Sequence, residues 1–267
     1  MASSRPKSQA RRELVVRESM MTALEGRTAI VTGGGAGVGA AIALALAAAK
    51  VNICIIGRSS KSLEAVAEKA RCHGTCPRFY QADLGDASEL DMVIARLERD
   101  LERVDILVLN AAYHASGRVE EAPVADLDQH YRVNLRAPFL LTQRLLPMLK
   151  NCRGQVVFVN SSSGVTAKAT TSQYDATKHA LKALADSLRG EVNEAGIRVL
   201  SVYLGQTASD MQSRIHEARK LPYRPERLLQ AEDVASIVLN ALRIPETAEI
   251  TDIHVRPMRR PNPSGVE

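Results

Sequence analysis

Short apolar runs alternate with longer stretches in which apolar side chains recur at helical spacing along most of this chain. We expect strands at Thr28–Thr32, Val51–Ile56, Arg78–Ala82, Ile106–Asn110, Gln155–Asn160, Arg198–Tyr203 and Glu249–Val255. Helices are expected at Gly39–Lys50, Ser60–Cys72, Ala87–Leu101, Val124–Lys150, Ser172–Ala195 and Ala231–Leu242. Strands that alternate with helices in this way predict an α/β fold, a doubly wound parallel β-sheet with helices on both faces.

The chain has the size and composition of one folded domain. Its 267 residues are 45% hydrophobic, which is enough to bury a full core, and we assign a single domain to residues 23–258. Residues 1–22 are basic and polar and are expected to form a mobile N-terminal extension, and residues 259–267 a C-terminal tail.

Three classes of partner receive little support. The longest uninterrupted apolar run, Ala40–Ala49, is too short to span a bilayer, so we expect a soluble protein without a membrane partner. The formal net charge of +5 is mild and the arginines are scattered, so we expect no nucleic-acid binding. Cys72 and Cys76 lack a second pair of ligands, so no metal site is predicted.

A glycine-rich segment follows the first expected strand. Gly33, Gly35, Gly37 and Gly39 lie between that strand and an Ala- and Leu-rich helix. Glycines allow a sharp turn and a close approach of the backbone to a pyrophosphate, whose charge meets the free N–H groups at the helix start. Strand, glycine loop and helix in this order predict a dinucleotide site.

A tyrosine and a lysine lie one helical turn apart. Tyr174 precedes Lys178 by four residues in a stretch that is typical of a helix, and Ser161 ends an apolar run upstream. Positions i and i+4 share one helix face, so we expect the ammonium to lie beside the phenol and to favour the phenolate. This arrangement predicts proton transfer by Tyr174. The alternative is a surface Tyr and Lys without a catalytic role.

Several motifs occur together in one order. They are Thr32-Gly33-x-x-x-Gly37-x-Gly39, Asp83-Leu84, Asn110-Ala-Ala112, Asn134 in Val-Asn-Leu, Ser161 before Gly164, and Tyr174 with Lys178. On these motifs the chain resembles the short-chain dehydrogenase/reductase family in its short single-domain form, from about Gly26 to Met258. The resemblance implies a Rossmann-type fold and hydride exchange between a nicotinamide cofactor and a carbonyl or secondary alcohol.

The resemblance also implies roles for individual residues. The catalytic residues would be Asn134, Ser161, Tyr174 and Lys178, with Tyr174 as general acid or base and Lys178 lowering its pKa. The cofactor would be bound by Gly33, Gly35, Gly37, Val38, Gly39, Arg58, Asp83, Leu84, Asn110, Tyr174, Lys178 and Ser209. Two positions depart from the family pattern, because Ala112 replaces a glycine and Leu204 replaces a proline. Both departures put cofactor affinity in doubt.

The end of the second expected strand bears on cofactor choice. Gly57 occupies the place where a carboxylate would bind the ribose 2′-hydroxyl of NAD, and Arg58 follows it. A guanidinium matches a phosphate with paired hydrogen bonds, so we expect NADP(H) in preference to NAD(H). The alternative is an arginine in a solvated loop.

The substrate is less well defined by the sequence. In the family the segment after the sixth strand completes the pocket, here Gln206–Leu229, and it is a plausible lid. Its cations Arg214, Arg219, Lys220 and Arg224 either attract an anionic substrate or form a solvated face. We expect a small-molecule carbonyl or alcohol substrate.

Other functions stay open. One is a catalytically silent NADP(H)-binding regulator or scaffold on the same fold, and another is an isomerase or dehydratase that retains its cofactor. The family resemblance also implies a homodimer or homotetramer, with the helices at Val124–Lys150 and Ser172–Ala195 as the contact face. A reducing NADP pool favours a cytoplasmic reductase.

Overall fold

A computed structural model describes residues 23–259 of the chain. The predicted extension, residues 1–22, and nearly all of the predicted tail lie outside the described residues. No helix within residues 23–259 is long and apolar enough to cross a membrane.

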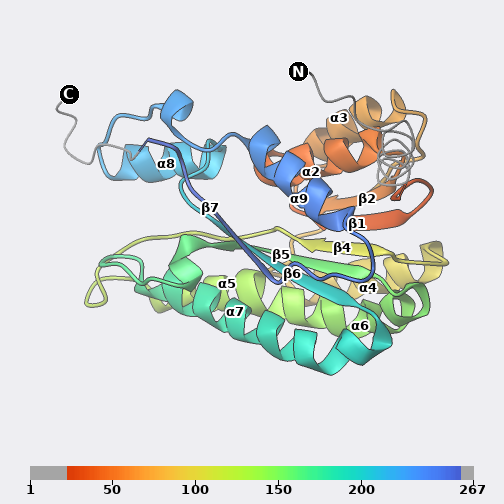
Figure 1. Ribbon diagram of the computed structural model, residues 1–267. Helices are drawn as coiled ribbons and strands as arrows, with labels where there is room; N and C mark the ends of the chain where they lie inside the picture. The colour runs from red at the N-terminus through yellow and green to blue at the C-terminus, as the bar shows by residue number, and fades with distance from the viewer. Residues whose placement is uncertain (1–22, 260–267) are drawn as a thin grey trace, which may run out of the picture.

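A seven-stranded parallel sheet forms the centre of the molecule (Figure 1). The strands are β1 Thr28–Thr32, β2 Asn52–Gly57, β3 Arg78–Gln81, β4 Ile106–Leu109, β5 Gln155–Ser161, β6 Arg198–Leu204 and β7 Asp252–Val255, in the order β3-β2-β1-β4-β5-β6-β7. The order reverses direction between β1 and β4, and the carboxyl ends of strands on either side of such a point border a crevice. The predicted doubly wound parallel sheet is confirmed.

Helices cover both faces of the sheet. On one face lie α2 Gly37–Ala48, α3 Ser60–Arg71 and α9 Ala231–Leu242, and on the other lie α4 Ala87–Asp100, α5 Val124–Tyr131, α6 Ala137–Cys152 and α7 Ser172–Val192 (Figure 1). The apolar side chains of α2, α3 and α9 on one face, and of α4, α6 and α7 on the other, pack against the central strands in two clusters separated by the sheet. The sheet therefore has a hydrophobic core on each of its faces.

Local sequence explains where individual helices begin. The side chain of Asp86 accepts a hydrogen bond from the backbone N–H of Glu89 at 2.9 Å and caps α4. From this start the buried side chains Leu90, Val93, Ile94 and Leu97 form one stripe on the helix. Ser59 caps α3 in the same way, so the chain turns directly from β2 into a helix beside the crevice.

The helix predicted over Val124–Lys150 is interrupted. A π-helix, η1, at Arg132–Arg136 separates α5 from α6. Pro138 follows it and lacks the N–H that a regular helix would direct at the carbonyl of Asn134, so the i to i−4 pattern cannot be completed here. The prediction of one continuous α-helix was therefore wrong.

The segment after β6 contains a helix that the sequence pattern did not reveal, α8 Asp210–Ala218. Short 3-10 turns complete the chain at η2 Ser162–Gly164, η3 Asn193–Ala195 and η4 Pro225–Arg227. The last strand, β7, is shorter than expected and begins at Asp252 rather than Glu249.

Candidate active site

A cavity of about 590 Å³ opens at the carboxyl ends of the central strands. Residues that follow β1, β2, β4, β5 and β6 line it, and α7 and α8 supply further side chains. Nine of the residues singled out from the sequence meet in this cavity: Gly33, Gly37, Val38, Arg58, Asn110, Ser161, Tyr174, Lys178 and Ser209. The location is the one where doubly wound sheets bind ligands.

Hydrogen bonds join the glycine loop to the loop after β4. The hydroxyl of Thr32 accepts from the backbone N–H groups of Asn110 and Ala111, at 2.8 and 3.0 Å. The amide of Asn110 in turn donates to the carbonyl of Thr32 at 3.0 Å. Asn110 therefore fixes the end of β1 against the end of β4 and holds the floor of the cavity.

The glycine loop fits a dinucleotide. Gly33 and Gly37 have φ values of +65° and +52°, which side-chain-bearing residues rarely adopt. A Cβ on Gly39 would lie 2.2 Å from the carbonyl oxygen of Gly33, so only glycine allows α2 to pass this close. The N-cap of α2, Ala36, offers no side-chain hydrogen bond, and the first turn has no acidic residue. The N–H groups in the first turn of α2 thus have no side-chain cap, and such groups suit a pyrophosphate.

The positions expected around the adenosine end separate into two groups. Arg58 lines the cavity, whereas Asp83 and Leu84 are not among its lining residues. In the glycine loop, Gly35 and Gly39 also lie outside the lining. The Asp83 carboxylate accepts a hydrogen bond from the backbone N–H of Gly85 at 2.8 Å and shapes the turn after β3. The contact that Asp83 makes in the structure therefore stabilises this turn.

Ser161, Tyr174 and Lys178 converge on the cavity from two elements. Ser161 ends β5, and Tyr174 and Lys178 lie one turn apart on α7. The Lys178 Nζ lies 5.7 Å from the Tyr174 ring centroid and donates to the carbonyl of Val159 at 3.3 Å. The expected shared helix face is confirmed, and it is turned inward, because Lys178 is 2% exposed.

Burial dominates the acid–base properties of this pair. Burial raises the pKa of Tyr174 to about 12, and a hydrogen bond with Ser161 opposes that shift. Burial lowers the pKa of Lys178 to about 8. Burial thus opposes the lowering of the Tyr174 pKa that is expected from Lys178, because a side chain that leaves water favours its neutral form.

We expect Lys178→Met to raise the free energy of unfolding near pH 7 by roughly 1–3 kcal/mol, because the variant no longer buries an ammonium. The folded pKa of Lys178 is about 8 and the ordinary value is 10.5, so the unfolded state holds the proton more tightly between these values. Wild-type stability therefore rises with pH across this window and is lost as pH falls through about 8. Urea unfolding near pH 7 and near pH 10 checks this. An equal difference at both pH values would contradict it.

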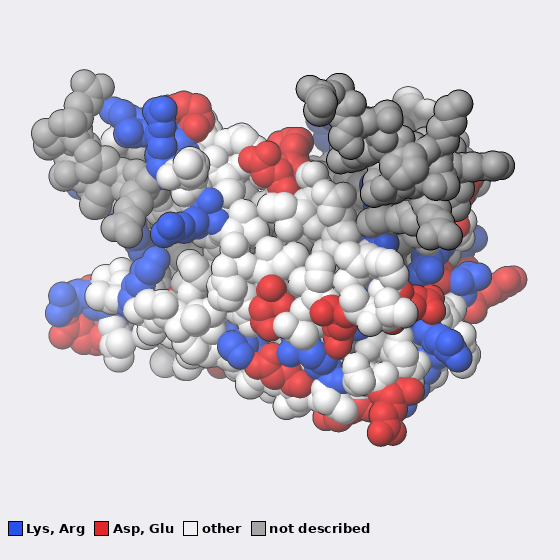
Figure 2. All heavy atoms as spheres, viewed as in Figure 1, with Lys and Arg blue, Asp and Glu red and all other residues white. Residues whose placement is uncertain are grey.

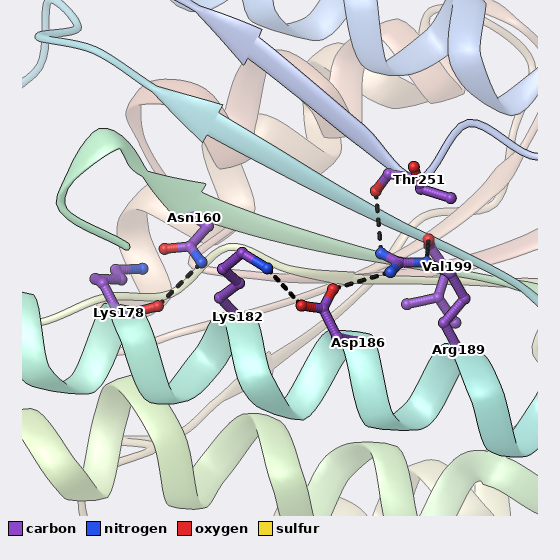
Figure 3. Close-up of polar contacts among 7 residues, drawn as sticks. All are labelled: Asn160, Lys178, Lys182, Asp186, Arg189, Val199 and Thr251. Atoms are coloured by element: carbon purple, nitrogen blue, oxygen red, sulfur yellow. Dashed lines mark hydrogen bonds and ion pairs between the residues drawn. The ribbon is translucent and has the colours of Figure 1, made fainter. Parts of the chain in front are cut away.

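Hydrogen bonds and an ion pair fix α7 beneath the sheet (Figure 3). The Asn160 amide donates to the carbonyl of Lys178 at 3.1 Å. Farther along the helix, Arg189 donates to the carbonyls of Val199 and Thr251 at 3.0 and 3.1 Å and pairs with Asp186. Tyr174 and Lys178 are thus carried on a helix that is attached at both ends of its buried face.

Asn134 links three segments from the π-helix. It is fully buried, and its Oδ1 accepts from the backbone N–H of Tyr113 at 2.7 Å. Its Nδ2 donates to the carbonyl of Tyr113 and to the Thr177 hydroxyl, at 3.0 and 3.1 Å. Thr177 donates to the carbonyl of Tyr174 at 2.9 Å. Asn134 does not line the cavity; it fixes the loop after β4 relative to α7.

Comparison with known proteins decides the family. A family model described as short chain dehydrogenase matches residues 27–220. The chain belongs to the short-chain dehydrogenase/reductase family. An uncharacterized short-chain type dehydrogenase/reductase of Sinorhizobium fredii is 31% identical, and the match covers 86% of this chain and 90% of that relative.

Solved structures of the family are similar over nearly their whole length. A 3-oxoacyl (acyl-carrier-protein) reductase from Agrobacterium tumefaciens with NADP bound is 26% identical with a TM-score of 0.79, covering 89% of this chain and 95% of that one. A short chain dehydrogenase from Burkholderia cenocepacia in complex with NADP is 28% identical with a TM-score of 0.76, covering 87% and 97%. This short-chain dehydrogenase/reductase is therefore an NAD(P)-dependent enzyme by family and fold.

The two departures from the family pattern both lie at the cavity. Ala112 and Leu204 are among its lining residues. Leu204 is the last residue of β6, where it is paired with Ser161 of β5 and Val255 of β7. A leucine in this place keeps a backbone N–H that proline would lack and allows the strand to continue to the edge of the cavity.

Helix α8 covers one side of the cavity in this short-chain dehydrogenase/reductase. Ser209 caps it by accepting from the backbone N–H of Gln212 at 3.2 Å, and the Ser209 N–H donates to the Tyr223 hydroxyl at 3.2 Å. Met211 and Ile215 line the cavity, whereas Leu221 and Tyr223 do not. Through its bond with Ser209, Tyr223 instead holds the later part of the segment Gln206–Leu229 against the beginning of α8.

Sequence reasoning missed His114. Its imidazole lines the cavity and packs edge-to-face on Tyr174, with ring centroids 4.7 Å apart. Burial, then His130 and Arg219, lower the pKa of His114 to about 4, so the ring is neutral at physiological pH. Its position shortly after the carboxyl end of β4 was the signal, since such residues line the crevice of a doubly wound sheet.

Proposed function

We propose that this protein is an NADP(H)-dependent oxidoreductase that interconverts a carbonyl and a secondary alcohol, with Tyr174 as general acid or base. The observation that carries this proposal is the convergence of Ser161, Tyr174 and Lys178 on one cavity below the glycine loop. NADP(H), when bound, supplies or accepts the hydride. The protein binds and orients the cofactor and the substrate, and it polarises the reacting carbonyl.

Each catalytic side chain has a role that its surroundings support. The Ser161 hydroxyl hydrogen-bonds the substrate oxygen as charge develops on it. Tyr174, protonated at neutral pH because its pKa is about 12, donates its proton in the reducing direction. Lys178, with its pKa lowered to about 8, is able to exchange a proton near neutral pH and would hold the nicotinamide ribose. Asn134 acts as a positioning residue through Thr177.

The proposed cofactor site extends along the cavity from this group. The loop residues Gly33, Gly35, Gly37, Val38 and Gly39 would bind the pyrophosphate, with Asn110 beside them. Asp83 and Leu84 would lie toward the adenine, Ser209 toward the nicotinamide amide and Arg58 toward the ribose phosphate. In favour of NADP(H) are the place of Arg58 in the lining and the NADP bound in two of the similar structures.

We expect Arg58→Asp to raise the KM for NADPH at least tenfold more than the KM for NADH. A guanidinium pairs with a phosphate through charge-assisted hydrogen bonds, each worth roughly 1.5–3 kcal/mol, and a carboxylate there repels it. Steady-state kinetics with both cofactors measures the two changes on the same protein. Equal changes for NADPH and NADH would contradict the assignment of Arg58.

The experiment that tests the function is NADPH oxidation with a panel of ketones, aldehydes and keto-acyl compounds, with NADH in parallel. Turnover of any of them establishes the reductase. Binding of NADPH without any turnover favours the silent regulator, and product formation while the cofactor stays bound and unchanged favours the isomerase or dehydratase.

Self-association is part of the proposal. Val124, Leu127 and Tyr131 on α5 and Phe139 on α6 are large apolar side chains that stay exposed, which suits a contact between copies. Along α7, which the resemblance also placed in the contact face, Leu188 is buried in the core and Leu184 packs against that core, so these two side chains face inward. Sedimentation velocity would measure the oligomeric state of the protein.

A reductase that uses the cytosolic NADP pool would work in the cytoplasm.

A further inference from the structure

One part of the cavity lining is rich in cations. Lys168, from the loop before α7, and Arg214 and Arg219, from α8 and the residue after it, all line the cavity. Asp210 is the one carboxylate among the described lining residues. The ion pairs found within residues 23–259 include none of these three cations. Their charge is available to a ligand.

Helix α8 runs from the glycine loop toward the catalytic tyrosine. A Cβ on Gly37 would lie 3.7 Å from the Cβ of Ser209, so the helix begins beside the cofactor loop. Beyond its other end, Arg219 acts on His114, whose pKa it helps to lower, and His114 contacts the Tyr174 ring. Arg219 and His114 line the same cavity, and the effect on the His114 pKa places the guanidinium toward His114 rather than toward the glycine loop.

Lys168 is fixed at the same end. Its backbone N–H donates to the Asp175 carboxylate at 2.7 Å, and the hydroxyl of Thr171 donates to the same oxygen at 2.8 Å. Asp175 is 2% exposed and directly follows Tyr174 on α7. A buried carboxylate with two donors holds the loop firmly, so the Lys168 side chain starts from a defined place beside the catalytic tyrosine.

We propose that the substrate is a small carbonyl compound that also carries an anionic group, held by Arg219 with Lys168 and Arg214 nearby while its carbonyl lies at Tyr174 and Ser161. This inference rests on the proposed reductase function. A guanidinium binds carboxylate or phosphate oxygens in pairs, and an ammonium adds charge without a fixed orientation. The neutral imidazole of His114, which lines the same cavity and contacts the Tyr174 ring, offers a further hydrogen bond.

The remaining cations of the segment do not line the cavity. Lys168, Arg214 and Arg219 are exposed side chains, as are Lys220 and Arg224, but only the first three are among the lining residues. Lys and Arg side chains are prominent on the surface at the end of the molecule where α8 lies (Figure 2). The sequence left open whether this charge run binds an anion or faces solvent. The structure separates it into Arg214 and Arg219 at the cavity and Lys220 and Arg224 outside it.

Binding to the NADP⁺-loaded protein tests the inference, because the oxidised cofactor cannot reduce a ketone. The probes are three keto acids with different spacings, acetoacetate, 4-oxopentanoate and 4-acetylbenzoate, each compared with its methyl ester by calorimetric titration. We expect at least one acid to bind roughly 10- to 100-fold more tightly than its ester, the worth of one charge-assisted hydrogen bond. The preference should weaken as salt is raised.

A matched pair of variants locates the effect. Arg219→Gln should lower the acid-to-ester affinity ratio by roughly tenfold or more. Arg224→Gln makes the same chemical change in the same segment, outside the cavity lining, and should leave the ratio as in the wild type. Thermal unfolding of both variants with bound NADP⁺ shows whether each is folded.

The outcomes separate this inference from the proposed function. Acids and esters that bind equally, the absence of binding by all of them, or equal effects of the two variants would overturn the anion pocket. Reduction of neutral ketones would still stand as reductase activity in each case. Selective binding of an acid that NADPH then fails to reduce would uphold the pocket and count against the reductase.

Discussion

Tyr174→Phe should lower kcat for carbonyl reduction by roughly 10²- to 10⁴-fold while NADPH binding changes little. The substitution removes one hydroxyl from a partly buried side chain that lines the cavity and keeps the ring that packs on His114. Without that hydroxyl no group in contact with the substrate oxygen carries a proton that it readily gives up, because Ser161 is a weak acid and Lys178 donates to the carbonyl of Val159. The measurement is kcat from NADPH absorbance, together with the Kd for NADPH.

Tyr131→Phe is the matched control for this result. Tyr131 ends α5, is 51% exposed and does not line the cavity, so loss of its hydroxyl should leave kcat as in the wild type. A Tyr174→Phe protein that binds NADPH and keeps more than about a tenth of wild-type kcat would exclude Tyr174 as the proton donor.

The second large effect is expected at Gly39. Gly39→Ala should raise the Kd for NADPH roughly 10- to 100-fold and lower the free energy of unfolding by about 1–3 kcal/mol. The new methyl group would lie 2.2 Å from the carbonyl oxygen of Gly33 and 2.5 Å from the Asn110 amide nitrogen. Backbone atoms cannot rotate aside as a side chain can, so the loop must move and lose its close approach to the pyrophosphate. Calorimetry gives the Kd, and urea unfolding the stability.

The chain offers a control with the opposite sign. A Cβ on Gly190 of α7 would meet nothing within 4 Å. Gly190→Ala should therefore leave NADPH binding unchanged and stabilise the protein by about 0.5–1 kcal/mol, the ordinary gain of alanine over glycine inside a helix. Should Gly39→Ala bind NADPH like the wild type, the close passage of α2 over Gly33 would not be needed for cofactor binding.

Much of the fold was predictable because strands and helices here differ in their hydrophobic period. The fully buried runs of β1 and β4 and the apolar stripe of α4 each carry a clear pattern. The hydrophobic period gave no sign of the π-helix, since one extra residue per turn leaves the composition unchanged; the signal in the sequence was Pro138, which lacks the N–H for the carbonyl of Asn134. Helix α8 was missed because a helix of Asp210–Ala218 that covers a cavity has only one buried side chain, His216.

The residues that form the site were predictable from the sequence, but their pKa values were not. Spacing along the chain placed Tyr174 and Lys178 on one face, and glycines at Gly33, Gly37 and Gly39 marked the loop. Spacing does not report burial, and burial sets the pKa values of Tyr174 and Lys178. His114 was overlooked for the same reason, because only the folded chain brings it against a residue far along the sequence.

The π-helix at Arg132–Arg136 has a consequence for insertions and deletions. Each residue in a regular helix advances the chain by about 100°, so this turn sets the angular phase of α6 relative to α5. In the present phase α6 directs Leu141, Leu145 and Leu149 into the core. Removal of one residue here would make the helix more regular and yet rotate that stripe away from the sheet. The length of this turn is therefore under stronger constraint than the identity of most of its side chains.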